Sequence, residues 1–328
     1  MAKLLRNDNV LRLIILVVLI IGFGLVTDGV TYSRQGLTNI LLQASVTGIA
    51  AVGQAFVILT GGIDLSMYGV GVLASVLGAA TMTSRFDLNI VGGEPLHVVF
   101  GVALILMVGL AAGAINGLLV SRLKVPALIV TLGTWQICYG LAQLLGGGYT
   151  ITNLNPSLAV LGQSSVFGIP VPVIEMFVLF AIAWYVLEHT SFGRAVYAVG
   201  ASPASAHLSG IKVTRIQFMV FLISGLMVGL AAVSIESRMM MASVRTLSGL
   251  QLDSIAAVAI GGVSIYGGRG SIIGVLIGVL ILAVIDSGLG ALGASTEVQN
   301  TVKGAIIILA VSIEYLRRSG RVGGGAAA

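Results

Sequence analysis

Charged side chains are scarce in this sequence. Asp, Glu, Lys and Arg make up 9% of the 328 residues, against about 25% in an ordinary soluble domain. Apolar residues make up 57%, and the mean hydropathy is +1.08. The apolar runs approach the length of about 20 residues that crosses a bilayer, and short connectors separate them. The composition excludes a soluble globular domain and predicts an all-α polytopic membrane protein.

The sequence also lacks the groups on which common enzymes depend. No G-x-x-x-x-G-K-[ST] motif occurs, so the chain has no phosphate-binding loop of its own. The three histidines fall in loops or at the ends of apolar runs, where none can activate a mid-span serine or join a metal site. The single cysteine, Cys138, excludes an intrachain disulfide and is expected to be a small buried side chain. We therefore expect no catalysis, metal or cofactor in this chain.

Hydropathy predicts about ten membrane spans. The first apolar run follows three basic residues but ends in no clear cleavage site, so we expect it to be retained as a span. The predicted spans are 10–26, 36–59, 63–83, 98–120, 125–146, 171–188, 216–237, 248–266, 270–289 and 298–315.

The Lys and Arg residues orient these spans. Twelve of the 17 lie on the side that holds both termini, which places both termini in the cytoplasm. This basic excess is accounted for by anionic lipid headgroups and implies no nucleic-acid partner. Residues 1–318 are predicted to form one membrane domain with a cytoplasmic insert at 189–215. The low-complexity tail, 319–328, is expected to be disordered.

Two spans carry glycine at every fourth position, a spacing that lets another helix approach closely. When spans 2–5 are compared with spans 7–10, each glycine tandem falls in the third helix of its group. This arrangement suggests an inverted repeat of the kind found in transporters, although helix packing alone also explains it. The glycines are Gly109, Gly113 and Gly117 in one span and Gly270, Gly274 and Gly278 in the other.

The polar insert contains the signals of a short helix. Ser202 is a good N-cap, Pro203 suits the first helical position, and Gly210 favours the left-handed conformation that ends a helix. The predicted helix, Pro203–Ser209, presents small residues that suit a groove in another protein. An amphipathic connector resting on lipid headgroups is the alternative. The residues concerned are Gly200, Ser202, Pro203, Ala204, Ser205, Ala206, His207, Leu208, Ser209 and Gly210.

Ordered motifs over residues 35–315 resemble those of the permease subunits of ribose-type ABC importers. They include Val57-Ile58-Leu59-Thr60-Gly61-Gly62-Ile63-Asp64-Leu65-Ser66, Thr131-Leu132-Gly133-Thr134, Tyr197-Ala198-Val199-Gly200, Leu208-Ser209-Gly210-Ile211 and Leu252-Asp253-Ser254-Ile255-Ala256-Ala257-Val258. Three positions depart from the pattern of that family: Gln54, Tyr68 and the run Ala201-Ser202-Pro203. The first two put the solute in doubt.

The resemblance implies a subunit of an importer in the bacterial inner membrane, with several partners. These are a second permease copy or a related permease, two cytoplasmic ATPase subunits that carry ATP and Mg²⁺, and an extracytoplasmic solute-binding protein. In such an importer Pro203–Ser209 would be the coupling helix. The expected cargo is a small neutral solute, a monosaccharide above all, moved by alternating access. A nucleoside, an autoinducer or a branched-chain amino acid stays open as the solute.

Polar residues within the spans are candidates for the translocation path. Asp64 is the strongest candidate, because placing a carboxylate within a bilayer costs about 2.5 to 3.5 kcal/mol of free energy. It either lines a polar path beside the helix-breaking Gly61 and Gly62 or caps the third span, and Asp253 is expected to cap the eighth. The candidate path residues are Asp64, Ser66, Asn116, Thr131, Thr134, Trp135 and Gln136.

An ion-coupled secondary transporter is the alternative from another class. It would use Asp64 or Glu236 as its coupling carboxylate. Replacing Gly200 and Gly210 should uncouple an ABC permease without disturbing its fold, whereas a secondary carrier should fail on Asp64→Asn. Trp135 and Tyr139, one helical turn apart, could also form a sugar-stacking platform, although packing explains the pair equally.

Overall fold

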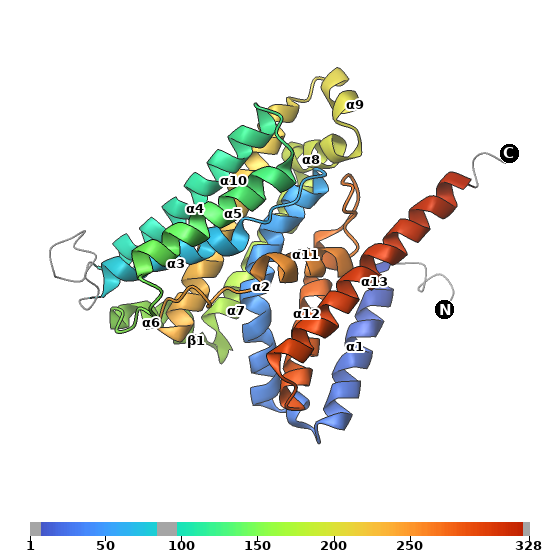
Figure 1. Ribbon diagram of the computed structural model, residues 1–328. Coiled ribbons are helices and arrows are strands. Elements are labelled where there is room, and N and C mark those ends of the chain that lie inside the picture. The colour runs from blue at the N-terminus through green and yellow to red at the C-terminus, as the bar shows by residue number, and fades with distance from the viewer. Residues whose placement is uncertain (1–7, 84–96, 324–328) are drawn as a thin grey trace.

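A computed structural model describes residues 8–83 and 97–323, and they are mostly helical, as predicted for an all-α membrane protein (Figure 1). The long helices are α1 (Asp8–Val26), α2 (Arg34–Leu59), α4 (Val98–Ser121), α5 (Ala127–Gly146), α7 (Val171–His189), α10 (Val213–Met239), α12 (Ile272–Ala291) and α13 (Thr296–Gly323). The shorter elements are η1 (Val30–Tyr32), α3 (Met67–Met82), η2 (Pro156–Leu158), α6 (Ala159–Gln163), the hairpin β1 (Ser165–Val166) and β2 (Ile169–Pro170), α8 (Ser191–Ala201), α9 (Pro203–Leu208) and α11 (Leu250–Ile260).

Each predicted span contains a helix, and seven helices of the described residues are long and apolar enough to cross a membrane. Two predicted spans are not continuous helices. Helix α3 has 16 residues and α11 has 11, fewer than the roughly 20 that a helical crossing needs. In the third span, residues 62–65 are non-helical and α3 begins only at Met67. Glycines 61 and 62 interrupt the helical pattern there, as their positions before the span suggested.

The predicted tail begins within α13. This helix continues to Gly323, and residues 324–328 lie outside the described residues.

Several elements meet at what we call the α9 end of the molecule. The Gly268 N–H, in the loop 261–271, donates to the Leu59 carbonyl oxygen at the end of α2 (2.9 Å). Lys124, just after α4, shares a surface hollow with α9. Helix α1 begins here too, because Arg12 lies against Gly262. At the opposite end an isolated bridge joins Ile151 to Ala242.

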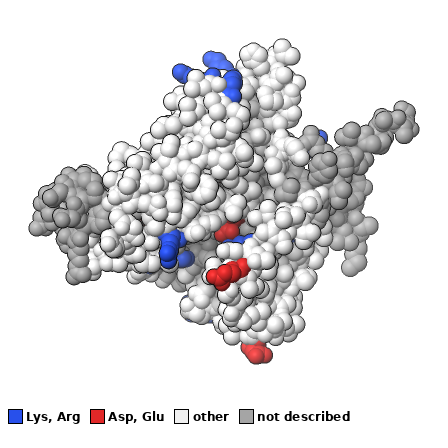
Figure 2. Space-filling view, in the orientation of Figure 1, with Lys and Arg blue, Asp and Glu red and all other residues white. Residues whose placement is uncertain are grey.

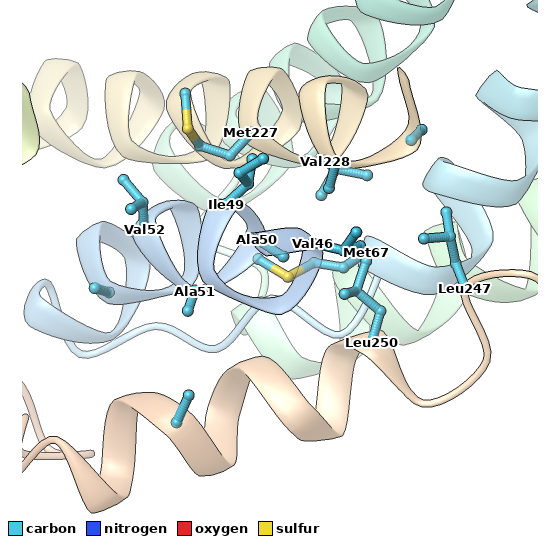
Figure 3. Close-up of a cluster of buried hydrophobic side chains, with 14 of the residues drawn as sticks. Val46, Ile49, Ala50, Ala51, Val52, Met67, Met227, Val228, Leu247 and Leu250 are labelled. Carbon is cyan, nitrogen blue, oxygen red and sulfur yellow. The ribbon is translucent and has the colours of Figure 1, made fainter. Parts of the chain in front are cut away.

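Helix α2 lies at the centre of the core. Its second half is buried on every side, which accords with a sequence that is apolar all round. Figure 3 shows the side chains of Ile49 and Ala50 between Met227 and Val228 of α10 on one side and Leu250 of α11 on the other. The central position of α2 joins the two four-helix groups into a single core.

The glycines of α4 bring it against α10, as the spacing predicted. A Cβ on Gly109 or Gly113 would overlap the backbone of α10 near Gly225. In α12, Gly274 and Gly278 face the backbone of α11 and the residue after it in the same way. The prediction that Gly270 belongs to this tandem was wrong, because α12 begins at Ile272 and Gly270 has a φ of 146° in the preceding loop.

The surface accords with a lipid environment. Figure 2 shows a mostly uncharged face, with Lys and Arg gathered at the end of the molecule where α4 ends and α10 begins. Acidic and basic groups also lie together in a hollow at the middle of this face. Large apolar side chains are exposed along α1, α4, α5 and α7, including Leu25, Phe100, Leu144 and Tyr185.

Candidate functional site: a short exposed helix and a buried polar network

The predicted short helix of the insert is present as α9, Pro203–Leu208. The Ser202 hydroxyl accepts from the Ser205 N–H (3.2 Å), and Pro203 occupies the first helical position. Gly210 has a φ of 82°, the left-handed conformation that the sequence predicted after the helix. Leu208 is 88% exposed at the tip of the helix. An exposed apolar side chain at the end of a short helix can fill a groove in a partner protein.

Sequence reasoning missed α8, which precedes α9. Its N-cap is Thr190, whose hydroxyl accepts from the Gly193 N–H (3.2 Å). Gly193, Val196 and Val199 are buried at helical spacing. That i, i+3, i+6 spacing was the signal that could have revealed the helix.

Gly200 is a packing residue of α8. A Cβ there would overlap the Leu59 carbonyl oxygen and the Gly268 nitrogen. The prediction that Gly200 could be replaced without disturbing the fold was therefore wrong. Gly210, by contrast, has open space around it, and its constraint is its backbone conformation alone.

Tyr197 fastens α8 to the loop 261–271. Its hydroxyl donates to the Gly270 carbonyl oxygen (3.1 Å). Burial, with a smaller contribution from the charge of Glu188, raises the pKa of Tyr197 to about 12, so the phenol keeps the proton that it donates. Helix α8 thus contacts both the end of α2 and this loop.

A surface hollow of about 530 Å³ lies beside α9. Pro203 and His207 of α9 line it together with Ile211, Lys212 and Lys124. The two lysines make it basic.

Asp64 lies at the centre of a buried polar network, two positions before the N-cap of α3. It is 2% exposed. Its Oδ1 accepts from the N–H and the hydroxyl of Ser66 (2.9 and 2.6 Å), and its Oδ2 accepts from the Ser224 hydroxyl of α10 (2.6 Å). A carboxylate with three donors is satisfied without an external ion.

The network extends to α4 and α5. Thr134 donates to the Asn116 carbonyl oxygen (2.6 Å), and the Asn116 amide donates to the Ser66 hydroxyl (3.0 Å). Because Ser66 then donates to Asp64, every hydrogen in this chain points towards the carboxylate. A chain polarised in one direction strengthens each of its bonds and stabilises the negative charge at its end.

Two further residues hold the backbone around Asp64. The Gln54 amide, oriented to match the groups that it faces, donates to the Asp64 carbonyl oxygen (3.0 Å) and accepts from the Asp64 N–H (3.3 Å). Thr131 donates to the Ile63 carbonyl oxygen (3.3 Å) and to its own helix. The non-helical backbone before α3 is therefore hydrogen-bonded inside the protein, as broken helices in membranes require.

The structure brings together five of the seven candidate path residues: Asp64, Ser66, Asn116, Thr131 and Thr134. The Gln136 side chain is exposed on another face of α5. Trp135 lies against Gly69 of α3, and its buried Nε1 has no hydrogen-bond partner among the described residues.

The Tyr139 ring packs at a tilt against the Tyr68 ring, with the centroids 5.4 Å apart. This contact ties α5 to α3 and gives Tyr139 a packing role. The sequence did not reveal Ser224, because a serine in an apolar helix carries no signal of what it faces.

The capping predictions for the two aspartates were wrong in detail. The N-cap of α3 is Ser66, and Asp64 supports it from two residues upstream. The N-cap of α11 is Gly249, whereas Asp253 lies within the first turn of the helix. Asp253 is instead paired with a lysine.

A second polar cluster joins α11, α12 and α13. The Lys303 ammonium group lies 3.2 Å from Asp253 Oδ2 and 3.2 Å from Asp286 Oδ2. The three side chains are 10 to 23% exposed. One cation between two carboxylates is a costly arrangement in a membrane, and such groups are normally kept for a functional reason.

Glu236 of α10 is the other buried acid. It is fully buried, and neither carboxyl oxygen has a hydrogen-bond partner among the described residues, although Ser75 of α3 lies nearby. Its surroundings therefore differ from those of Asp64.

Comparison with known proteins settles the family. Residues 36–311 match the family described as "Branched-chain amino acid transport system / permease component". The chain belongs to this permease family. It is 39% identical to the ribose import permease protein RbsC of Bacillus subtilis (strain 168), over 85% of this chain and 84% of that protein.

Two other permeases are similar over most of their length. The fructose import permease protein FrcC of Rhizobium meliloti is 39% identical, over 92% of this chain and 84% of that protein. The L-arabinose ABC transporter permease protein AraH of Azospirillum brasilense is 33% identical, over 88% and 82%. No solved structure matches the chain significantly. The comparisons and the apolar helices together make this chain a multi-pass membrane permease rather than an ATPase.

Proposed function

We propose that this chain forms the translocation path of an ATP-driven, binding-protein-dependent importer of a monosaccharide. The observation that carries the proposal is the membership of the permease family together with relatives whose names are those of ribose, fructose and L-arabinose permeases. The branched-chain amino acids in the family description remain the competing solute class.

The proposed complex supplies what the chain does not. Two cytoplasmic ATPase subunits bind ATP and Mg²⁺, an extracytoplasmic protein delivers the sugar, and a second permease copy or a related permease completes the path within the lipid bilayer. Helix α9 enters a groove in the ATPase subunit, with Leu208 as its apolar anchor. The basic hollow that includes Lys124 and Lys212 favours acidic groups at the rim of that groove.

The proposed topology has ten spans in a single membrane domain with both termini in the cytoplasm. It places the α9 end on the cytoplasmic side, where Figure 2 shows Lys and Arg gathered. Helices α3 and α11, too short to cross alone, cross together with the non-helical segments that precede or follow them.

The contacts between helices support the inverted repeat. Helix α10 packs on α4 as α2 packs on α12, and α10 packs on α3 as α2 packs on α11. Helices α4 and α5 flank α3 as α12 and α13 flank α11. Exchanging α2–α5 with α10–α13 therefore reproduces the set of contacts. Helix α2 ends at the α9 end, whereas α10 begins there. The two helices therefore run in opposite directions, as the two halves of an inverted repeat do.

The coupling route runs from α9 through α8 to α2. Gly200 of α8 lies on the Leu59 carbonyl group, and Leu59 is five residues before Asp64. Closure of the ATPase dimer would displace α8 and move the Gly61-Gly62 hinge. The Asp64 network would then be the first polar element of the path to change.

Reconstitution tests the proposal. The permease is purified with the ATPase subunit that associates with it and placed in liposomes with the solute-binding protein on the opposite side from the ATPase. Uptake of radiolabelled ribose, fructose, arabinose and leucine is then compared with and without ATP. ATP-dependent uptake of a sugar is expected. Uptake of leucine alone would replace the sugar by a branched-chain amino acid, and uptake driven by an ion gradient without ATP would overturn the importer.

A further inference from the structure

The two polar clusters occupy corresponding places in the two helix groups. The first joins residues at the start of α3 to α4 and α5, and the second joins α11 to α12 and α13. Asn116 lies five residues before the end of α4, and Asp286 lies five residues before the end of α12. Thr134 is the eighth residue of α5, and Lys303 is the eighth residue of α13.

Corresponding places in oppositely directed groups lie near opposite membrane faces. Helix α4 ends at the α9 end, so Asn116 is about 8 Å from that end at a rise of 1.5 Å per residue. Helix α12 begins at the α9 end, so Asp286, 14 residues along it, is about 21 Å away and close to the opposite end. Each cluster therefore closes a three-helix group near one face of the membrane.

We propose that the Lys303–Asp253–Asp286 cluster is an outer latch and that the Asp64–Ser66–Asn116–Thr134 network is the corresponding inner latch of the transport cycle. The three charged residues are positioning residues: they hold α13 and α12 against α11 at the outer end, and their separation opens that end to the binding protein. This inference rests on the proposed function, because a latch at each face has a purpose only in a path that opens alternately.

The chemistry of the two latches differs in a way that suits the two faces. The outer latch holds three charged groups that are partly exposed, so water entering from outside can solvate them as they separate. In the inner latch, Asp64, Ser66 and Asn116 are at most 3% exposed, and neutral donors converge on one carboxylate. Its separation needs a push from within the protein, and α8 lies one short segment away from it.

Cysteine accessibility tests the inference in the complete importer. In a Cys138→Ala background with normal uptake, Ser254→Cys reports on the outer end, because Ser254 is buried beside Asp253 in α11. Ser121→Cys reports on the inner end, because Ser121 is the buried last residue of α4. Membrane-impermeant maleimide is added to right-side-out and to inside-out vesicles, and the rate of labelling is measured.

Lys303→Met should raise labelling at position 254 from the outside by about tenfold and leave position 121 within about twofold, as a shift of one equilibrium requires. Thr134→Val should do the reverse from the inside. Asp286→Asn, which keeps the pair of Lys303 with Asp253, should give a smaller rise, which keeps the test valid if Lys303→Met fails to fold.

Equal increases in labelling rate at positions 254 and 121 for every variant would show a general loosening of the protein and overturn the two-latch proposal. No increase at either position would also overturn it. Association with the ATPase subunit and ATP-dependent uptake are measured on the same preparations. Normal uptake without sided labelling would overturn the latches alone. Sided labelling without an ATPase subunit would keep the latches and overturn the proposed source of energy.

Discussion

Asp64→Asn is the substitution that examines the polar network most directly. It changes the shape of the side chain very little but removes the charge and replaces one acceptor oxygen by a donor. The carboxylate accepts two hydrogen bonds from Ser66 at Oδ1 and one from Ser224 at Oδ2. The asparagine oxygen is expected to replace Oδ1, where two donors meet, so its amide nitrogen then faces the Ser224 hydroxyl.

The expected cost follows from these contacts. A hydrogen bond to a charged group contributes about 1.5 to 3 kcal/mol, whereas a neutral one contributes about 0.5 to 1.5 kcal/mol. Two bonds lose their charge assistance, and the third changes direction because Ser224 can rotate its hydroxyl to accept. Asparagine also removes the cost of burying a charge, which offsets part of this loss, so the substitution should lower the free energy of unfolding by about 1 to 2 kcal/mol.

The assay is unfolding of the purified permease in detergent, with Thr134→Val as the matched control. That control removes the hydrogen bond from Thr134 to Asn116, the bond of the network farthest from Asp64. It should lower the free energy of unfolding by about 0.6 to 1 kcal/mol. An Asp64→Asn protein as stable as the wild type would refute the view that the network holds an ionised carboxylate. Unchanged stability with uptake abolished would instead assign Asp64 to an ion or to the solute.

Three further substitutions examine the coupling side and the remaining buried acid. Gly200→Val should lower the free energy of unfolding by about 1 to 3 kcal/mol, because the new side chain would overlap the Leu59 carbonyl group. Gly133→Ala is the control and should be tolerated, because no atom lies within 4 Å of the added methyl group. The two variants are compared by their yield of folded protein. Ser202→Ala should destabilise α9 by about 1 kcal/mol through the lost N-cap and weaken stimulation of the ATPase subunit by the binding protein, with uptake reduced in proportion. Glu236→Gln should change stability by less than about 1 kcal/mol and preserve uptake, because among the described residues Ser75 is the polar side chain near the carboxyl group and no opposite charge lies beside it; loss of all uptake would revive an ion-coupled carrier.

The long apolar helices could be predicted from the sequence because hydropathy alone decides them. The start and stop of α9 were equally accessible, since Ser202, Pro203 and Gly210 each act through their own backbone. The two short helices were not, because their ends depend on tertiary contacts. Residues 63–65 stay non-helical where Gln54 and Thr131 satisfy their backbone from other helices.

The polar site was predicted as a set of residues but not as an arrangement. Asp64 could be recognised because a carboxylate in an apolar region is rare. Its donor Ser224 is 160 positions away in the chain, and serine is common in helices of every kind. The pairing of Lys303 with Asp253 and Asp286 could not be predicted, because it depends on the packing of three helices. A charged residue in an apolar segment can be recognised from the sequence, whereas its hydrogen-bond and ion-pair partners are known only from the fold.

The measurement that tests the central claim most directly is ATP hydrolysis by the reconstituted permease and its ATPase subunit, with sugar-loaded and sugar-free binding protein. We predict hydrolysis that rises with the loaded binding protein, accompanied by uptake of the same monosaccharide. Solute uptake that proceeds at the same rate without ATP, or hydrolysis that no sugar-loaded binding protein changes, would contradict the account.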